Sequence, residues 1–172
     1  MSGLAAARCT GSVNQMSSLD VAHFKEVLGH FVTGVVVVAA IGPEGPAGFT
    51  CQTFGSLSLE PALVSFAANR AGRSWPKVHE SGVVGISVLE SNQEVVARVF
   101  ATSGTNKFDG IGWAPSPAGA PYLEGALVHI EGRIVDANPY GDHDIVVVAV
   151  DHCVSHPGSP LMYYRSGFTV FD

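Results

Sequence analysis

Charge is scarce in this chain of 172 residues. Asp, Glu, Lys and Arg together make up 14% of it, against about a quarter in an average globular domain. The nine Lys and Arg residues are scattered and the formal net charge is −6, so the basic stripe typical of a nucleic-acid-binding protein is missing. We therefore expect no nucleic-acid partner. The low charge also leaves few polar side chains to cover a surface, which favours a buried subunit interface.

Cysteines and long apolar runs are scarce as well. Cys9, Cys51 and Cys153 form no CxxC pair, which disfavours a disulfide framework or a structural zinc site and favours free thiols in a reducing cytoplasm. The longest apolar stretch, residues 35–41, is far too short to cross a bilayer. The first nineteen residues lack the continuous apolar centre of a secretory signal. We expect a cytoplasmic protein with no membrane partner.

The length suits a single domain. Residues 1–16 are rich in Ala, Ser and Gly without an apolar period, so we expect a mobile N-terminal arm ahead of one domain at residues 17–172. Asp20 is a candidate N-cap for a short amphipathic helix. The apolar residues of this helix recur at spacings of three and four; they are Val21, Phe24, Val27, Leu28 and Phe31.

Short β-branched runs separated by turn residues predict most of the other elements. Strands are expected at residues 35–41, 62–68, 83–89, 128–134 and 145–150, with a Gly/Pro turn at 42–46 and a short helix at 75–80. Residues 128–134 alternate between apolar and polar, and we expect them to pair with residues 145–150.

Ser91-Asn92-Gln93-Glu94 matches a capping box, and it predicts a helix whose inward residues are Val95, Val96, Val99 and Phe100. In total, the sequence predicts six or seven strands and three short helices. The regular strand-helix alternation of a doubly wound sheet is missing, and so are the GxGxxG and GxxxxGK loops of Rossmann and P-loop enzymes. A mainly β fold, a small antiparallel β-barrel with short helices, is therefore favoured.

One segment concentrates small hydroxyl side chains and backbone donors. Residues 48–61 read Gly-Phe-Thr-Cys-Gln-Thr-Phe-Gly-Ser-Leu-Ser-Leu-Glu-Pro and lie between two apolar, β-branched runs. Such a loop could hold a flat heterocycle with polar edges, and Gly141-Asp142-His143 joins it from farther along the chain. Together these features suggest a flavin site.

Several short motifs occur in the order found in one protein family. They are Phe31-Val32-Thr33-Gly34-Val35, the run from Gly48 to Phe54, Ser56-Leu57-Ser58-Leu59-Glu60-Pro61, Lys107-Phe108, Gly141-Asp142-His143 and Pro160-Leu161-Met162-Tyr163-Tyr164. From about Phe24 to Phe168 the chain resembles the short-chain flavin reductases, which share the FMN-binding split barrel and supply reduced flavin to two-component monooxygenases. Ala62 and Gly132 depart from the pattern, because the family usually has a second proline at the first position and often a cysteine at the other.

The resemblance implies hydride transfer from C4 of NADH or NADPH to N5 of FMN or FAD, with no side chain acting as nucleophile or base. It also implies a homodimer and a transient transfer of reduced flavin to a monooxygenase. The flavin-binding residues that it implies are Thr33, Gly34, Val35, Val36, Thr50, Cys51, Gln52, Thr53, Ser56, Leu57, Ser58, Ala67, Asn69, Arg73, Ser74, Lys107 and Phe108. The residues that it implies at the nicotinamide dinucleotide are Gly141, Asp142, His143 and Tyr163.

Within that set, the resemblance implies a place for each part of the flavin. Residues 50–53 would follow the edge of the isoalloxazine ring, residues 33–36 would flank it, and Ser56 and Ser58 would contact the ribityl chain. The phosphate would lie near Asn69, Arg73 and Ser74, which agrees with the charge-assisted donors that a guanidinium and a hydroxyl offer. Arg70 is a second candidate for the phosphate.

Several of these residues also have a plainer explanation. Residues 50–53 suit a polar strand end, Arg73 suits a solvated surface charge, and His143 suits a turn. Cys51 suits a small buried hydrophobe better than a redox thiol. The two tryptophans, Trp75 and Trp113, suit a core or interface better than a ring stacked on a ligand.

Three further hypotheses concern the site or the protein as a whole. A metal site at His152, Cys153 and His156 is disfavoured, because adjacent residues of a strand point to opposite faces. The chain could be a non-catalytic module that carries or senses flavin. It could also be a split-barrel oxidoreductase that holds its flavin permanently.

Overall fold

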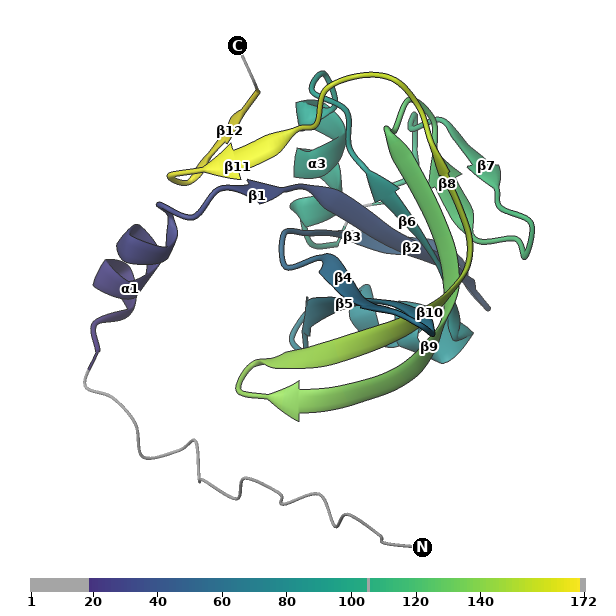
Figure 1. The fold of residues 1–172 in the computed structure, drawn as a ribbon, viewed down its shortest axis with the longest axis horizontal. Coiled ribbons are helices and arrows are strands. Elements are labelled where there is room, and N and C mark those ends of the chain that lie inside the picture. The colour runs from purple at the N-terminus through teal and green to yellow at the C-terminus, as the bar shows by residue number, and fades with distance from the viewer. Residues whose placement is uncertain (1–18, 105, 171–172) are drawn as a thin grey trace, which may run out of the picture.

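The computed structural model describes residues 19–104 and 106–170 (Figure 1). The predicted N-terminal arm, residues 1–16, lies outside these residues. The elements in chain order are α1 (Val21–Leu28), β1 (Thr33–Gly34), β2 (Val36–Gly42), β3 (Gly45–Cys51), β4 (Gly55–Leu59), β5 (Ala62–Asn69), α2 (Trp75–Ser81), β6 (Val83–Val88), α3 (Glu94–Ala101), β7 (Trp113–Pro115), β8 (Pro121–Leu123), β9 (Val128–Tyr140), β10 (His143–Ser155), β11 (Met162–Tyr164) and β12 (Gly167–Thr169).

A curled sheet of seven strands forms the body of the molecule. Its order is β3-β2-β6-β9-β10-β5-β4, and every neighbouring pair is antiparallel. The curl brings the β3 edge back against β5, where the backbone N–H of Ala67 donates to Thr53 Oγ1 at 2.8 Å. The expected mainly β, antiparallel barrel is therefore confirmed, with a seam between β3 and β5.

Strand β2 is buried on both faces. Val36 and Val38 point into the barrel, where they pack with Phe66 and other residues of the inner core. Val37 faces the other way, into a second core that includes Phe100 of α3. A strand covered on both faces needs apolar residues at successive positions rather than at alternate ones, which explains the unbroken apolar run from residue 35.

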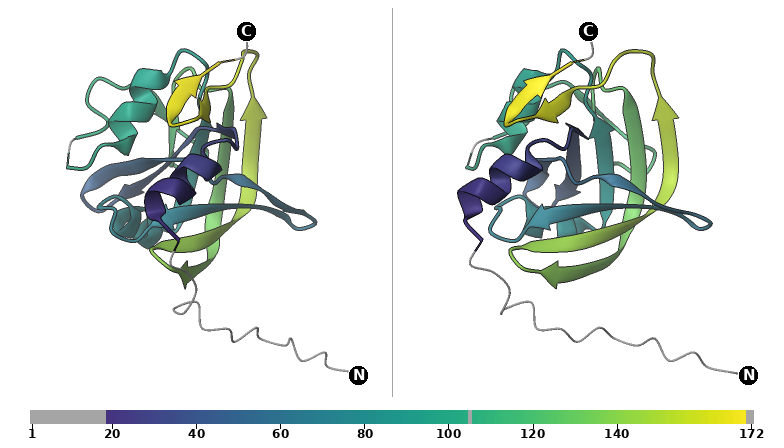
Figure 2. Two further views of the ribbon diagram at one scale, coloured as in Figure 1. Left: turned by 90° about the vertical axis from the view of Figure 1, so that its left-hand side faces the viewer. Right: turned by 60° about the vertical axis from the view of Figure 1, so that its left-hand side comes forward.

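Helix α1 has the predicted N-cap, but the structure leaves its apolar face uncovered. The Asp20 carboxylate accepts hydrogen bonds from the backbone N–H groups of Ala22 at 3.3 Å and His23 at 3.1 Å. Phe24 is 47% exposed and Val27 53% exposed, and none of the residues of α1 is buried. Figure 1 shows the helix standing away from the barrel, at the end of the segment that leads into β1, and Figure 2 shows the same helix from its outer side.

Helix α3 forms as predicted, but the capping box is wrong. The N-cap is Gln93, which makes no side-chain cap hydrogen bond, and Ser91 Oγ donates to Glu90 Oε1 at 2.6 Å instead. The carboxylate of Glu90 competes successfully for the serine, so the helix begins two residues later. Val95 is 69% exposed rather than inward, and Ala97 takes the inward position.

The segment at residues 48–61 is mostly strand, where the sequence suggested a loop. Its residues complete β3 and form β4, with only residues 52–54 between the two strands. Within the described residues the structure has twelve strands rather than six or seven. The additional strands include β1, β7, β8, β11 and β12, which have two or three residues each and are too short to show a period. Across residues 19–104 and 106–170, no helix is long and apolar enough to cross a membrane.

Candidate active site

Three adjoining pockets lie along strand β3, which contributes residues to each of them. The central pocket, of about 330 Å³, is lined by Thr50, Asn69, Arg73, Ser74, Trp75, Lys107 and His143, among others. The Lys77 pocket, of about 290 Å³, shares Arg73, Ser74, Gly104 and Lys107 with it and adds Pro46, Ala47, Gly48, Lys77, Asn106 and Phe108. The Tyr163 pocket, of about 500 Å³, shares Thr50 and Ala101 with the central pocket and adds Gln52, Arg98, Thr102, Tyr163, Ser166 and Phe168.

The loop that follows β5 brings the three predicted phosphate-binding residues to the central pocket. Asn69 shapes the loop, because its Oδ1 accepts from the N–H of Ala71 at 2.8 Å and its backbone oxygen accepts from the N–H of Gly72 at 3.0 Å. Arg73 and Ser74 then line the pocket. Arg70 has a different environment, because its Nε lies 3.6 Å from Asp144 Oδ1.

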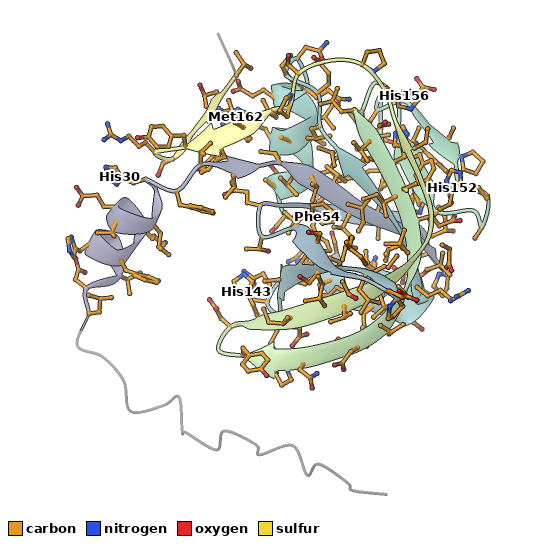
Figure 3. All side chains as sticks on the ribbon, viewed as in Figure 1. His30, Phe54, His143, His152, His156 and Met162 are labelled. Carbon is orange, nitrogen blue, oxygen red and sulfur yellow. The ribbon has the colours of Figure 1, made fainter. Side chains whose placement is uncertain are left out.

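The turn between β9 and β10 places His143 in the same pocket. His143 lies opposite Asn69 in the β10–β5 register, and the turn before it uses the positive φ of Gly141, +61°. His143 Nδ1 lies 2.7 Å from Asp142 Oδ1, and this hydrogen bond lowers the pKa of the Asp142 carboxyl. Asp142 therefore holds the imidazole ring, leaving Nε2 for another partner. Figure 3 shows His143 at the open edge of the barrel.

Lys107 is half-buried and joins three elements. Its Nζ donates to the backbone oxygens of Phe100 at 2.8 Å and Gly48 at 3.1 Å, and to Ser74 Oγ at 3.2 Å. Burial lowers the pKa of its ammonium group. All three protons have acceptors within the protein, so Lys107 braces the wall of the pocket. Phe108, next to it, packs edge-on against Phe100 in the second core.

The hydroxyl groups of residues 50–53 are occupied by the protein itself. Thr50 Oγ1 donates to the backbone oxygen of Ala97 at 2.6 Å, and Thr53 holds Ala67 across the seam. Cys51 is buried with its Sγ 3.2 Å from Thr53 Oγ1, and burial raises the pKa of its thiol. This segment therefore offers a ligand its backbone groups and the side chain of Gln52.

Strand β1 contributes an unusual hydroxyl. Among the described residues, Thr33 Oγ1 is the one buried side-chain nitrogen or oxygen atom without a hydrogen-bond partner. Thr33 pairs with Tyr163 across β1 and β11. Gly34 is exposed, whereas Val35 and Val36 are buried in the two cores, so their side chains are not available to a ligand.

Comparison with known proteins identifies the chain. The profile of the family described as "Flavin reductase like domain" matches residues 28–172. The chain belongs to this flavin reductase family. It is 37% identical over 156 residues to the reductase subunit HsaB of a flavin-dependent monooxygenase from Mycobacterium tuberculosis, covering 89% of this chain and 83% of that protein. It is 36% identical over 149 residues to the FMN reductase (NADH) SmoA of Agrobacterium fabrum, covering 87% and 85%.

Solved structures of the family have the same fold. Nitrilotriacetate monooxygenase component B from Mycobacterium thermoresistibile superposes with a TM-score of 0.85 at 36% identity, covering 88% of this chain and 86% of that one. The NADH:FAD oxidoreductase SgcE6 of Streptomyces globisporus C-1027, solved in complex with NAD and FAD fragments, gives 0.84 at 32% identity, covering 89% and 93%. The split-barrel fold of the flavin reductases is thus confirmed for this chain.

Not all of the residues that the resemblance implies come together. Ser56, Leu57 and Ser58 lie on the edge strand β4 and line none of the three pockets. Ala67 contributes its backbone to the seam. Tyr163 lines its own pocket, with its ring 5.2 Å from that of Phe168.

Other pocket residues were missed by the sequence reasoning. Arg98 resembles an ordinary charge on a helix surface and pairs with Glu94 at 2.6 Å, yet its guanidinium lies 4.9 Å from the ring of Phe168. Lys77 and Asn106 carry no local signal, because only the tertiary fold brings them beside Arg73.

The tryptophans and the candidate metal ligands have clear surroundings. Trp75 belongs to the inner core, and its Nε1 donates to Asp144 Oδ2 at 2.7 Å, although one side of it also lines the central pocket. Trp113 packs against Phe108. In Figure 3, His152 and His156 lie on the side of the molecule away from His143. Within residues 19–104 and 106–170, no three His, Cys, Asp or Glu side chains form a group that could hold a metal ion.

Proposed function

We propose that this protein is an NADH-dependent flavin reductase that reduces FMN or FAD and passes the reduced flavin to a monooxygenase. The observation that carries the proposal is the central pocket, where Arg73 and Ser74 face the same space as His143. A flavin bound in this pocket could therefore place its phosphate at Arg73 and Ser74 and still have the imidazole of His143 beside it, where the nicotinamide dinucleotide would approach. NADH is favoured over NADPH because relatives such as SmoA are named as NADH-dependent enzymes.

The residues present fit a flavin. The guanidinium of Arg73 and the hydroxyl of Ser74 supply charge-assisted donors to a phosphate, and Lys107 keeps Ser74 in place. Gln52 and the backbone of its neighbours supply polar groups for the edge of the ring. Thr33 lines none of the three pockets, so its buried hydroxyl is not among these groups.

The chemistry requires no protein nucleophile or base. A bound flavin supplies the electrophilic N5 that takes a hydride from nicotinamide C4, and the reaction consumes one NADH and one proton per flavin reduced. The protein's part is to orient the two rings. His143, held by Asp142, would position the nicotinamide half. Cys51 stays protonated near neutral pH and serves as a wall of the barrel.

We also propose that two copies form a homodimer. Helix α1 presents Phe24, Val27 and Leu28 to solvent, and the neighbouring Phe31 is 76% exposed. An exposed apolar patch of this kind marks an interaction surface, and a second copy of the chain would cover it. A single-subunit mass in light scattering at micromolar concentration would contradict this arrangement.

The free thiol of Cys51 agrees with a cytoplasmic location.

The proposed activity is tested by steady-state oxidation of NADH and NADPH with added FMN, FAD or riboflavin. We expect turnover of free flavin with NADH. Quenching of flavin fluorescence without turnover would indicate a carrier module instead. Flavin that co-purifies and does not exchange with added flavin would indicate a permanently bound cofactor.

A further inference from the structure

Arg98 is the charged residue of the Tyr163 pocket. The other described residues that line this pocket are neutral, and two of them, Tyr163 and Phe168, carry aromatic rings. An arginine in such a place can contact a ligand directly or hold the wall of the pocket. The contacts that Arg98 makes within the chain favour the second role.

The wall that carries the two rings is the hairpin of β11 and β12. It belongs to a separate three-stranded sheet, β1-β11-β12, in which β1 contributes two residues. Figure 1 shows this hairpin beside α3 and outside the curled sheet of seven strands. The turn of the hairpin is joined to the end of α1, where the N–H of Arg165 donates to the oxygen of Gly29. Few backbone hydrogen bonds therefore fix the hairpin relative to the barrel, and its position depends on side-chain contacts.

Arg98 makes one of these contacts from α3. Its guanidinium carbon lies 4.9 Å from the centroid of the Phe168 ring, and a cation over the face of an aromatic ring is attracted to it. Phe168 lies opposite Tyr163 in the β11–β12 register, and the two rings meet edge-on with their centroids 5.2 Å apart. A contact that holds Phe168 therefore also holds Tyr163.

The guanidinium itself is fixed by its own helix. Glu94 Oε1 accepts from Arg98 Nε at 2.8 Å and lies 2.6 Å from Nη2. A glutamate four residues before an arginine is a favourable pair on a helix surface. The helix is anchored in turn, because Ala97 and Phe100 are buried in the second core. Arg98 thus connects a helix that the core holds to a hairpin that has little support of its own.

We propose that Arg98 is a positioning residue for hydride transfer. By lying over Phe168, it keeps the ring of Tyr163 in the place where the nicotinamide dinucleotide would meet it. This inference rests on the proposed flavin reductase function. Without Arg98 the hairpin would be free to move away from α3, and the dinucleotide would meet a less defined surface. The proposed phosphate contacts, Arg73 and Ser74, do not line this pocket, so flavin binding should change little.

The first test is the KM for NADH at saturating flavin, for the wild-type full chain, Arg98→Met and Arg98→Lys. Arg98→Met should raise this KM about threefold to fivefold, the size of a cation–π contact at an exposed site. Arg98→Lys keeps a cation near the ring and should restore most of the loss. The kcat and the dissociation constant of the flavin should stay within about twofold, and circular dichroism checks that the variants are folded.

The matched control is Arg133→Met. The side chain of Arg133 is 65% exposed, against 64% for Arg98, and it also pairs with a carboxylate, that of Asp151 at 2.9 Å. It lines none of the three pockets. Removing this charge should leave the KM for NADH unchanged. An equal rise in both variants would show an effect of net charge and would overturn the proposal.

A double-mutant cycle with Phe168→Leu tests whether Arg98 acts through the ring. Phe168→Leu alone should raise the KM for NADH, and adding Arg98→Met to it should have no further effect. A further rise of threefold or more, on the order of the cation–π contact, would mean that Arg98 contacts the dinucleotide itself. That result would overturn the positioning role.

Hydrogen exchange measured by mass spectrometry tests the structural step without turnover. The amides of residues 162–169 should exchange faster in Arg98→Met than in the wild type, whereas those of β2 should not change. Unchanged exchange in the hairpin, or an unchanged KM for NADH, would overturn the proposal. A wild type that does not oxidise NADH would overturn the proposed reductase function, and the exchange rates would still decide whether Arg98 holds the hairpin.

Discussion

The phosphate end of the central pocket and helix α1 differ in how many of their groups find partners within a single chain. The polar groups at the pocket have hydrogen-bond partners, whereas the apolar side chains of α1 remain uncovered. Around the pocket, Lys107 has an acceptor for each of its protons, and Thr50 donates to Ala97. Helix α1 has no buried residue, and its C-terminal end is held by a hydrogen bond from the N–H of Arg165 to the oxygen of Gly29 at 2.8 Å. The first region is prepared before any ligand arrives. The second has the composition of a surface that another subunit covers.

The largest expected effect comes from placing charge on the uncovered face of α1. Val27→Asp should raise the dissociation constant of the homodimer at least about 100-fold, because each interface would bury an unpaired carboxylate. The stability of the monomer should change little, since Val27 is already 53% exposed. Sedimentation velocity measures the constant, and Ala22→Asp is the control, because the exposed Ala22 lies about 140° around the same helix from Val27. An unchanged dimer would show that α1 is not the covered surface.

Removing the brace at the pocket should have the next largest effect. Lys107→Met leaves Ser74 without its partner and two backbone oxygens without a donor, which should lower the free energy of unfolding by about 2–3 kcal/mol. Flavin affinity should fall as well, since Ser74 is no longer held. Urea denaturation and fluorescence quenching measure the two quantities. A loss of flavin affinity with full stability would mean that Lys107 contacts the ligand directly.

Changing His143 should affect the nicotinamide half alone. His143→Ala should raise the KM for NADH about tenfold and leave the dissociation constant of the flavin within about twofold. Asp142→Asn should give the same pattern with a smaller change, because it only loosens the ring. Steady-state kinetics at saturating flavin distinguish these values. Equal loss of flavin binding would contradict the place assigned to His143.

The smallest effect on activity is expected at Cys51. Burial raises the pKa of its thiol, so above the ordinary thiol pKa of about 8.5 the folded state binds more protons than the unfolded state, and stability falls as pH rises. Cys51→Ala should remove that alkaline decrease above about pH 8.5 while leaving kcat within about twofold. Denaturation curves at several pH values measure this. A large loss of kcat would indicate that the thiol takes part in the reaction.

The sequence predicts those elements whose cause is local. The apolar run of β2, the N-cap of α1 by Asp20 and the hairpin at residues 42–46 all follow from neighbouring residues, and the structure has each of them. The order of short motifs, together with the family they resemble, also identifies the region that lines the central pocket.

What the sequence does not predict depends on contacts between distant residues. Ser91 loses its capping role because Glu90 competes for its hydroxyl. Thr50 appears free in the sequence, but the fold places it against the backbone oxygen of Ala97. Strand β1 exists because two residues meet β11 about 130 positions later in the chain. No pattern within a short window carries that information.

The seam between β3 and β5 has a consequence for how such a barrel can diversify. A side chain, Thr53, makes the hydrogen bond that holds the two edges at this point, whereas the strands elsewhere in the barrel are joined by ladders of backbone hydrogen bonds. Exchange of Thr53 for a residue without a hydroxyl would release the backbone N–H of Ala67 from its acceptor and leave it to water or to a ligand. The residue at position 53 therefore decides both how the seam is closed and which polar groups the barrel presents there.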